Sequence, residues 1–129
     1  MAYPTGTGTE VLKRTTIHAG SDTATSFRWD GTMATTGTSS YTVTALHIIT
    51  VLSVVVSEIG NAAAGEIFDL AVHDGSNYIY LRQQQNLAAY ETFVWNDRVV
   101  LIGGDKLLVN CSSAANVDLH CSYIDQDWS

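Results

Sequence analysis

The sequence predicts an all-β protein, an antiparallel β-sandwich or jelly roll that follows an extended N-terminal arm. Short segments rich in Val, Ile and Tyr recur at a spacing of roughly eight to twelve residues, as in known sandwiches and barrels. Turn dipeptides such as Asp74-Gly75 and Gly103-Gly104 stand between these segments. Thirteen of the fifteen threonines precede residue 45, and threonine favours strands over helices. Such a succession of strands and turns is typical of two packed sheets rather than of an α/β fold.

The N-terminal third contains the first two expected strands. Three aliphatic residues within 10–17 and two aromatic residues within 26–29 supply the apolar side chains that a half-buried strand needs. Before residue 10 the chain has no apolar anchor except Tyr3. We therefore expect residues 1–9 to form the arm and residues 10–129 to form a single sandwich domain.

Residues 42–57 form the expected central strand of the sandwich. Ile, Val and Leu follow one another there almost without interruption, which indicates burial on both faces of the strand. A helix is the competing interpretation, but the β-branched clusters around Ile49 and Val55 disfavour it. The polar and small residues 60–65 then predict a loop.

The next two expected strands, over residues 67–73 and 78–82, form a hairpin around Asp74-Gly75. Side chains alternate between the two faces of a strand, so each strand has an inward and an outward set. In the second strand the outward set is Tyr78, Tyr80 and Arg82, and the inward set is Ile79 and Leu81.

The remaining expected strands lie over residues 91–95, 99–101, 106–112 and 116–124. Gly103-Gly104-Asp105 between two apolar segments predicts a second hairpin, and a turn near Ala114 would join the last two strands. Cys111 and Cys121 would then both face inward, about four residues out of register. Disulfides need Cβ atoms within roughly 4.5 Å, so we expect two free buried thiols.

Composition limits the classes of partner. The chain has 129 residues, enough for one domain, and 13 acidic against six basic residues give a net charge of −7, which argues against nucleic-acid binding. Charged residues make up only 15%, below the usual quarter, so we expect partners to cover part of the surface. The N-terminus lacks the features of a signal peptide, and the apolar stretch 45–56 is too short to span a membrane. We expect a protein made in the cytoplasm that binds neither nucleic acid nor membrane.

No group of residues in the sequence has the spacing typical of a reaction centre. His73-Asp74 is the most suggestive pair, but neighbours in a strand point to opposite faces. The other three histidines lack a second ligand at the spacing of known metal motifs, which favours surface or structural roles. We therefore expect no enzyme, no catalytic residue, no bound metal and no cofactor.

Aromatic residues are the candidates for binding. Tyr78 and Tyr80 share one face of a strand, where paired rings can stack on sugar rings or fill a protein interface. We favour the interface. Trp128, one residue from the C-terminus, suits a pocket on a partner. The expected partner-interface residues are Tyr3, Pro4, Tyr78, Tyr80 and Trp128.

The second half of the chain resembles small virion proteins of tailed bacteriophages. In both, a strand of alternating residues, an Asp-Gly turn, a Tyr-containing strand, a Val-rich strand, a Gly-Asp-Lys-Leu turn and a final strand follow one another. These elements lie here at 67–72, Asp74-Gly75, 77–81, 99–101, 104–109 and 118–123. The Thr-rich N-terminal third has no counterpart in the resemblance.

The resemblance implies a capsid decoration (cement) protein of the small jelly-roll type. Such a protein binds the major capsid protein between capsomers on the virion surface, as a homotrimer, and stabilises the head. The alternatives are a receptor- or glycan-binding head of a tail fibre or spike and a head–tail adaptor protein that forms a ring.

Overall fold

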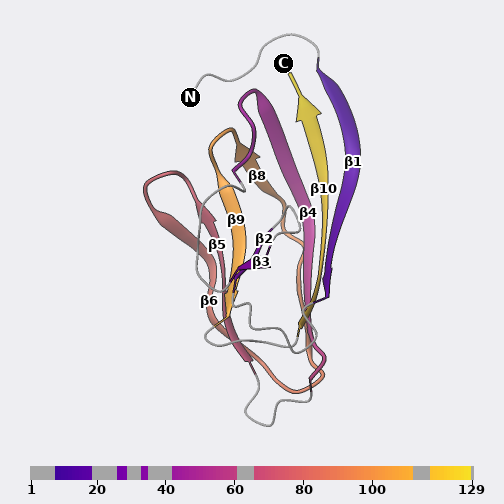
Figure 1. Cartoon of the computed structure of the whole chain (residues 1–129), viewed down its shortest axis with the longest axis vertical. Helices are drawn as coiled ribbons and strands as arrows, with labels where there is room; N and C mark the ends of the chain where they lie inside the picture. Colours follow the sequence, from indigo (N-terminus) through magenta and orange to yellow (C-terminus); the bar gives the residue numbers. More distant parts are fainter. Residues whose placement is uncertain are drawn as a thin grey trace.

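The computed structural model describes residues 8–18, 26–28, 33–34, 42–60, 66–111 and 117–128. These residues form ten strands in two antiparallel sheets, and none of them is helical (Figure 1). In the first sheet β1 (Thr9–His18), β10 (Val117–Asp127) and β4 (His47–Glu58) lie in that order, and both β7 (Thr92–Trp95) and β8 (Val99–Ile102) pair with the far side of β4. The order in the second sheet is β3 (Met33–Ala34), β2 (Ser26–Arg28), β9 (Lys106–Cys111), β5 (Glu66–His73) and β6 (Tyr78–Leu87).

The strand order is that of a jelly roll. The first and last strands, β1 and β10, are neighbours, and the chain crosses repeatedly from one sheet to the other. Among the strands of the described residues, β2–β3 and β5–β6 are the consecutive ones that pair with each other. The predicted all-β sandwich is confirmed.

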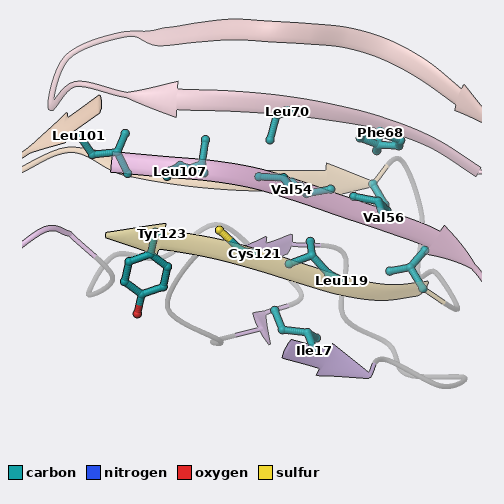
Figure 2. Close-up of a cluster of buried hydrophobic side chains, with 14 of the residues drawn as sticks. Ile17, Val54, Val56, Phe68, Leu70, Leu101, Leu107, Leu119, Cys121 and Tyr123 are labelled. Carbon is teal, nitrogen blue, oxygen red and sulfur yellow. The ribbon is translucent and has the colours of Figure 1, made fainter. Parts of the chain in front are cut away.

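The core lies between the two sheets, where alternate residues of each strand meet (Figure 2). From the first sheet come residues such as Val54, Val56, Leu119 and Cys121, and from the second sheet come Phe68, Leu70 and Leu107. Phe68 and Phe93 meet edge to face, with ring centroids 5.2 Å apart.

Strand β4 is central, but the prediction that it is buried on both faces is wrong. Ile49 and Val51, and after a register shift Val54 and Val56, point into the core, while Ile48, Leu52 and Val55 are only half-buried. These residues are only half-buried because the second face of β4 belongs to the outer surface of the sandwich. The strand also begins later than expected, at His47, after Leu46 with its φ of 64°.

The Gly103-Gly104-Asp105 turn exists, but the predicted hairpin around it is wrong. β8 pairs with β4 in the first sheet, whereas β9 pairs with β2 and β5 in the second. The Asp105 amide donates to the Ile102 carbonyl at 2.9 Å, and Gly104, with a φ of 92°, donates to the Val43 carbonyl at 2.9 Å. The turn therefore carries the chain from one sheet to the other, and the apolar strands on both sides of it, β8 and β9, contribute residues to the core.

The two cysteines also lie in different sheets, so the predicted pairing of the last two strands is wrong. β9 carries Cys111 beside Phe68, and β10 carries Cys121 beside Val54. Both thiols are nonetheless free and buried, as expected. Burial raises the pKa of each thiol to about 12, with the charge of Glu66 adding to the effect at Cys111.

The hairpin around Asp74-Gly75 is confirmed. His73 pairs with Tyr78, the Asp74 amide donates to the Asn77 carbonyl at 3.2 Å, and Gly75 has a φ of 99°. Asp74 Oδ1 accepts hydrogen bonds from the amides of Asn77 and Ser76 at 2.8 and 2.9 Å, and these bonds lower the pKa of the Asp74 carboxyl. This closed turn fixes the start of β6.

Candidate interaction surfaces

The aromatic residues of the β5–β6 hairpin form a strip that we call the tyrosine strip, consisting of His73, Tyr78 and Tyr80. The rings of Tyr78 and Tyr80 lie 6.3 Å apart at an interplanar angle of 24°, and each tyrosine is 47% exposed. His73 meets the Tyr78 ring edge to face at 4.6 Å. The two tyrosines therefore stand side by side, each about half exposed, at the start of a strand that a closed turn fixes.

The strip stands at an open edge of the sandwich. Among the described residues β6 pairs only with β5, and in Figure 1 this hairpin extends away from the rest of the second sheet. Ile79, on the opposite face of β6, is 50% exposed, because this end of the hairpin reaches beyond the core. An edge strand with exposed side chains on both faces is a ready site for another chain to pair.

Arg82 is exposed, as predicted, but it does not join the tyrosine strip. The pairing of β5 with β6 shifts between Leu70 and Ala71, so that Tyr80 opposes Ala71 but Arg82 opposes Leu70. An irregularity of this kind turns the following side chains to the other face. The Arg82 guanidinium carbon consequently lies 6.0 Å from the centroid of the Phe93 ring, which belongs to the first sheet.

Trp128 lies at the end of the first sheet. Its backbone amide donates to the Leu46 carbonyl at 2.9 Å, and its partly buried indole covers Gly8, where an added Cβ would come within 2.8 Å of the ring. The indole Nε1 is buried and has no hydrogen-bond partner in the described part of the chain. Tyr3 and Pro4 lie outside the described residues. The structure thus brings Tyr78 and Tyr80 together and places Trp128 in the other sheet.

Sequence reasoning missed a second surface, the outer face of the first sheet. The strand register places alternate residues of its five strands on this face, and three of them are prominently exposed: Leu12 at 71%, Val100 at 58% and Val94 at 53%. A hollow of about 280 Å³ lies beside Val55 and His120 on this face. Adjacent apolar residues, such as Val11-Leu12, were the available signal, because one of two neighbours in a strand must face outward.

A network of ionisable groups ties β1, β4 and β10 together at one end. His47 Nδ1 lies 2.8 Å from Asp125 Oδ1, and Lys13 Nζ donates to Asp125 Oδ2 at 3.0 Å. That hydrogen bond and the charge of Asp125 raise the pKa of Lys13. Partial burial alone would raise the pKa of Asp125, but hydrogen bonds from Lys13 and His47 outweigh it and lower that pKa. Asp127 Oδ1 lies 3.4 Å from His47 Nε2.

Two carboxyl groups are buried at the other end of the sandwich. Glu58 Oε1 accepts the Gly60 amide at 2.6 Å and Oε2 accepts the Tyr90 amide at 2.8 Å, which fixes the turn between β6 and β7. Burial raises the pKa of Glu66, and the charge of Glu58 raises it further. Glu58 holds the loop amides, and both carboxyl groups are closed to solvent, with Glu58 2% and Glu66 7% exposed.

The remaining polar groups serve local structure. His73 Nδ1 accepts the Gly75 amide at 3.1 Å within the turn, and His18 Nδ1 lies 2.5 Å from Asp118 Oδ1 across β1 and β10. Within the described ranges, no group of three or more His, Cys, Asp or Glu side chains is placed to hold a metal ion. No helix in those ranges is long and apolar enough to cross a membrane.

Comparison with known proteins yields no relative for this chain: no protein-family model matches it, and no curated protein is significantly similar to it.

Proposed function

We propose that this chain is a structural protein of a tailed-bacteriophage virion, a capsid decoration protein that binds the major capsid protein as a homotrimer and stabilises the head. The observation that carries the proposal is the exposed edge strand β6 with its tyrosine strip on a jelly-roll sandwich. The resemblance of roughly residues 45–125 to small phage virion proteins gives the proposal its biological class.

The edge strand offers both kinds of contact that a decoration protein needs. Its unpaired backbone groups can add a strand from the capsid protein or from a second copy, and its tyrosine rings supply area that loses water on binding. Tyr78 and Tyr80 are the interface residues on this edge. Trp128 and the arm residues Tyr3 and Pro4 belong to the opposite sheet and the N-terminus, and we assign them to capsid attachment.

Net charge sets the size of the contact that such a trimer needs. Each copy carries −7, so three copies carry 3 × −7 = −21, and apolar burial must outweigh the mutual repulsion. An interface of standard size buries about 800 Å² per partner. If all of this area were apolar, its burial would contribute about 20 kcal/mol per partner at about 25 cal/mol per Å², before the large costs of association are subtracted. A chain with only 15% charged residues is suited to this balance.

The proposal is tested by reconstituting bare phage heads with this protein. We expect hundreds of copies per head and heads that retain DNA to a higher temperature than bare ones. Tyr78→Ala/Tyr80→Ala is expected to abolish binding, while Tyr90→Ala, which removes a 68% exposed tyrosine from another turn, binds like the wild type. Equal DNA retention by bare and saturated heads would refute the decoration role.

A second function, a glycan-binding head of a tail fibre or spike, is favoured by one specific observation. Two half-exposed tyrosine rings lie 6.3 Å apart and nearly parallel, and exposed aromatic rings of this kind can pack against a sugar ring. Copy number separates the functions, because a fibre is present in a few to a few tens of copies per particle. Binding to a host glycan that Tyr78→Ala/Tyr80→Ala abolishes, together with low copy number, would replace the decoration proposal.

A further inference from the structure

Strand β1 forms the open edge of the first sheet. Among the described residues it pairs only with β10, and nearly all of its ten residues are exposed. Leu12, at 71%, is the most exposed large hydrophobic residue described in the chain. A long edge strand with an exposed leucine near its middle is a place where another strand pairs, unless the protein blocks it.

The register with β10 fixes which face each β1 residue occupies. Lys13 pairs with Tyr123 and Ile17 with Leu119, and these β10 residues are buried in the core, so the odd-numbered residues of β1 belong to the inner face. The even-numbered residues Glu10, Leu12 and Arg14 therefore lie together on the outer face. They form a short row in which an acid and a base flank a leucine.

From this row we infer that β1 pairs antiparallel with β1 of a second copy, about a two-fold axis that passes between the two Leu12 residues. In this register Leu12 opposes Leu12, and Glu10 of each copy opposes Arg14 of the other. On the inner face Val11 opposes Lys13, and at the ends Thr9 opposes Thr15. Opposed residues of unlike charge and opposed apolar residues both stabilise antiparallel pairs. The two first sheets then form one continuous sheet.

Charge selects this register over its neighbours. A two-fold axis normal to the sheet must pass through one self-paired residue, because opposed residues share a face. Centring on Lys13 or Arg14 places like charges directly against each other. In a register centred on Val11, Glu10 opposes Leu12 and Arg14 opposes Gly8, so neither charged side chain has an oppositely charged partner. Only the Leu12-centred register among these satisfies every charge of the row.

The residues of the row remain available for this contact. Lys13 binds Asp125 within its own copy, on the inner face, so its charge is compensated there. Glu10 accepts one hydrogen bond from Gln126 through Oε2 at 3.1 Å, and a carboxylate accepts more than one such bond. Arg14 has no ion pair within the described ranges. The contact does not depend on the proposed function, because it concerns two copies of this chain alone.

Charge reversal tests the contact in solution. Sedimentation is measured on Tyr78→Ala/Tyr80→Ala, which lacks the proposed trimer contact on β6. In this background we expect a reversible dimer, which Glu10→Arg and Arg14→Glu each weaken about tenfold or more, since each change opposes like charges twice per dimer. The double variant Glu10→Arg/Arg14→Glu restores opposite charges and is expected to regain dimerisation. A protein that is monomeric at every concentration would refute the contact and assign the charges of β1 to edge protection. A double variant no better than the single ones would refute the register.

Cross-linking tests the register independently of affinity. In Leu12→Cys the two new thiols oppose each other across the axis, and oxidised glutathione is expected to convert the protein to a disulfide-linked dimer. Arg14→Cys places its thiols four residues out of register, and Val100→Cys lies at the other edge of the same sheet, so both are expected to stay monomeric. The native thiols are buried and do not interfere. Cross-linking of Arg14→Cys but not of Leu12→Cys would overturn the Leu12-centred register.

Discussion

Substitution of Glu58 tests how much its buried hydrogen bonds to loop amides stabilise the sandwich. Its carboxylate accepts two backbone amides, from Gly60 at 2.6 Å and from Tyr90 at 2.8 Å, and only 2% of the residue is exposed. A buried amide that loses its acceptor costs about 1–3 kcal/mol. Glu58→Ala removes both acceptors, so we expect a loss of about 2–6 kcal/mol in the free energy of unfolding.

Glu58→Gln separates the hydrogen bonds from the charge. The amide side chain keeps one oxygen but presents an NH₂ group to the second backbone N–H, so about half of the Glu58→Ala loss is expected. Glu58→Gln also removes the charge that raises the pKa of Glu66, which returns part of the stability at neutral pH. The glutamine variant therefore stays measurable even where the alanine variant does not fold.

Urea denaturation at neutral pH measures both variants against the wild type. The expected order of stability is wild type, Glu58→Gln, Glu58→Ala, with the slope of unfolding against urea unchanged. An alanine variant within about 0.5 kcal/mol of the wild type, the range of ordinary surface substitutions, would refute the reasoning. It would mean that water replaces the carboxylate at no cost and that the turn after β6 does not depend on it.

Three further predictions concern the core and its ionisable groups. Folding raises the pKa of Glu66 above its ordinary value of 4.5. The contribution of Glu66 to the free energy of unfolding therefore falls as pH rises from the unfolded to the folded pKa, and Glu66→Gln lacks this loss. Thermal unfolding of both proteins against pH measures the difference. With the pKa of both thiols raised to about 12, alkylation of Cys111 and Cys121 is expected to be slow in the folded protein and to give two adducts by mass spectrometry after denaturation without reductant; missing adducts would indicate a disulfide. Leu101→Ala is expected to cost about 2–5 kcal/mol in urea denaturation, while the neighbouring exposed Val100→Ala stays within about 0.5 kcal/mol; equal costs would contradict the assignment of faces.

Local patterns of the sequence predicted the features that local chemistry decides. The Asp74-Gly75 turn and the burial of both thiols follow from turn residues and from period-two alternation. The fold class follows from the number and spacing of such segments. None of these features requires knowledge of which strands become neighbours.

The same patterns could not predict which strands pair with each other. The two segments around Gly103-Gly104 have the sequence of a hairpin, yet they pair with β4 and β5, because an apolar strand is buried equally well in either sheet. The position of Arg82 over the Phe93 ring, away from the tyrosine strip, depends on a register shift opposite Leu70 that the sequence alternation does not reveal. The outer face of the first sheet was missed for a related reason. Continuous apolar runs such as that of β4 look alike whether one face or both are covered.

The two proposed contacts use edges that do not compete. The tyrosine strip lies on β6 at the edge of the second sheet, and the Leu12 row lies on β1 at the edge of the first, on opposite sides of the molecule in Figure 1. A copy that pairs through β1 therefore keeps β6 open. A two-fold contact at one edge combined with a three-fold contact at the other joins trimers to one another, and repeated contacts of this kind link neighbouring sites into a network. In the proposed decoration role, each contact gains from the high local concentration that the other provides, so that a modest β1 affinity in solution would be sufficient on the capsid surface.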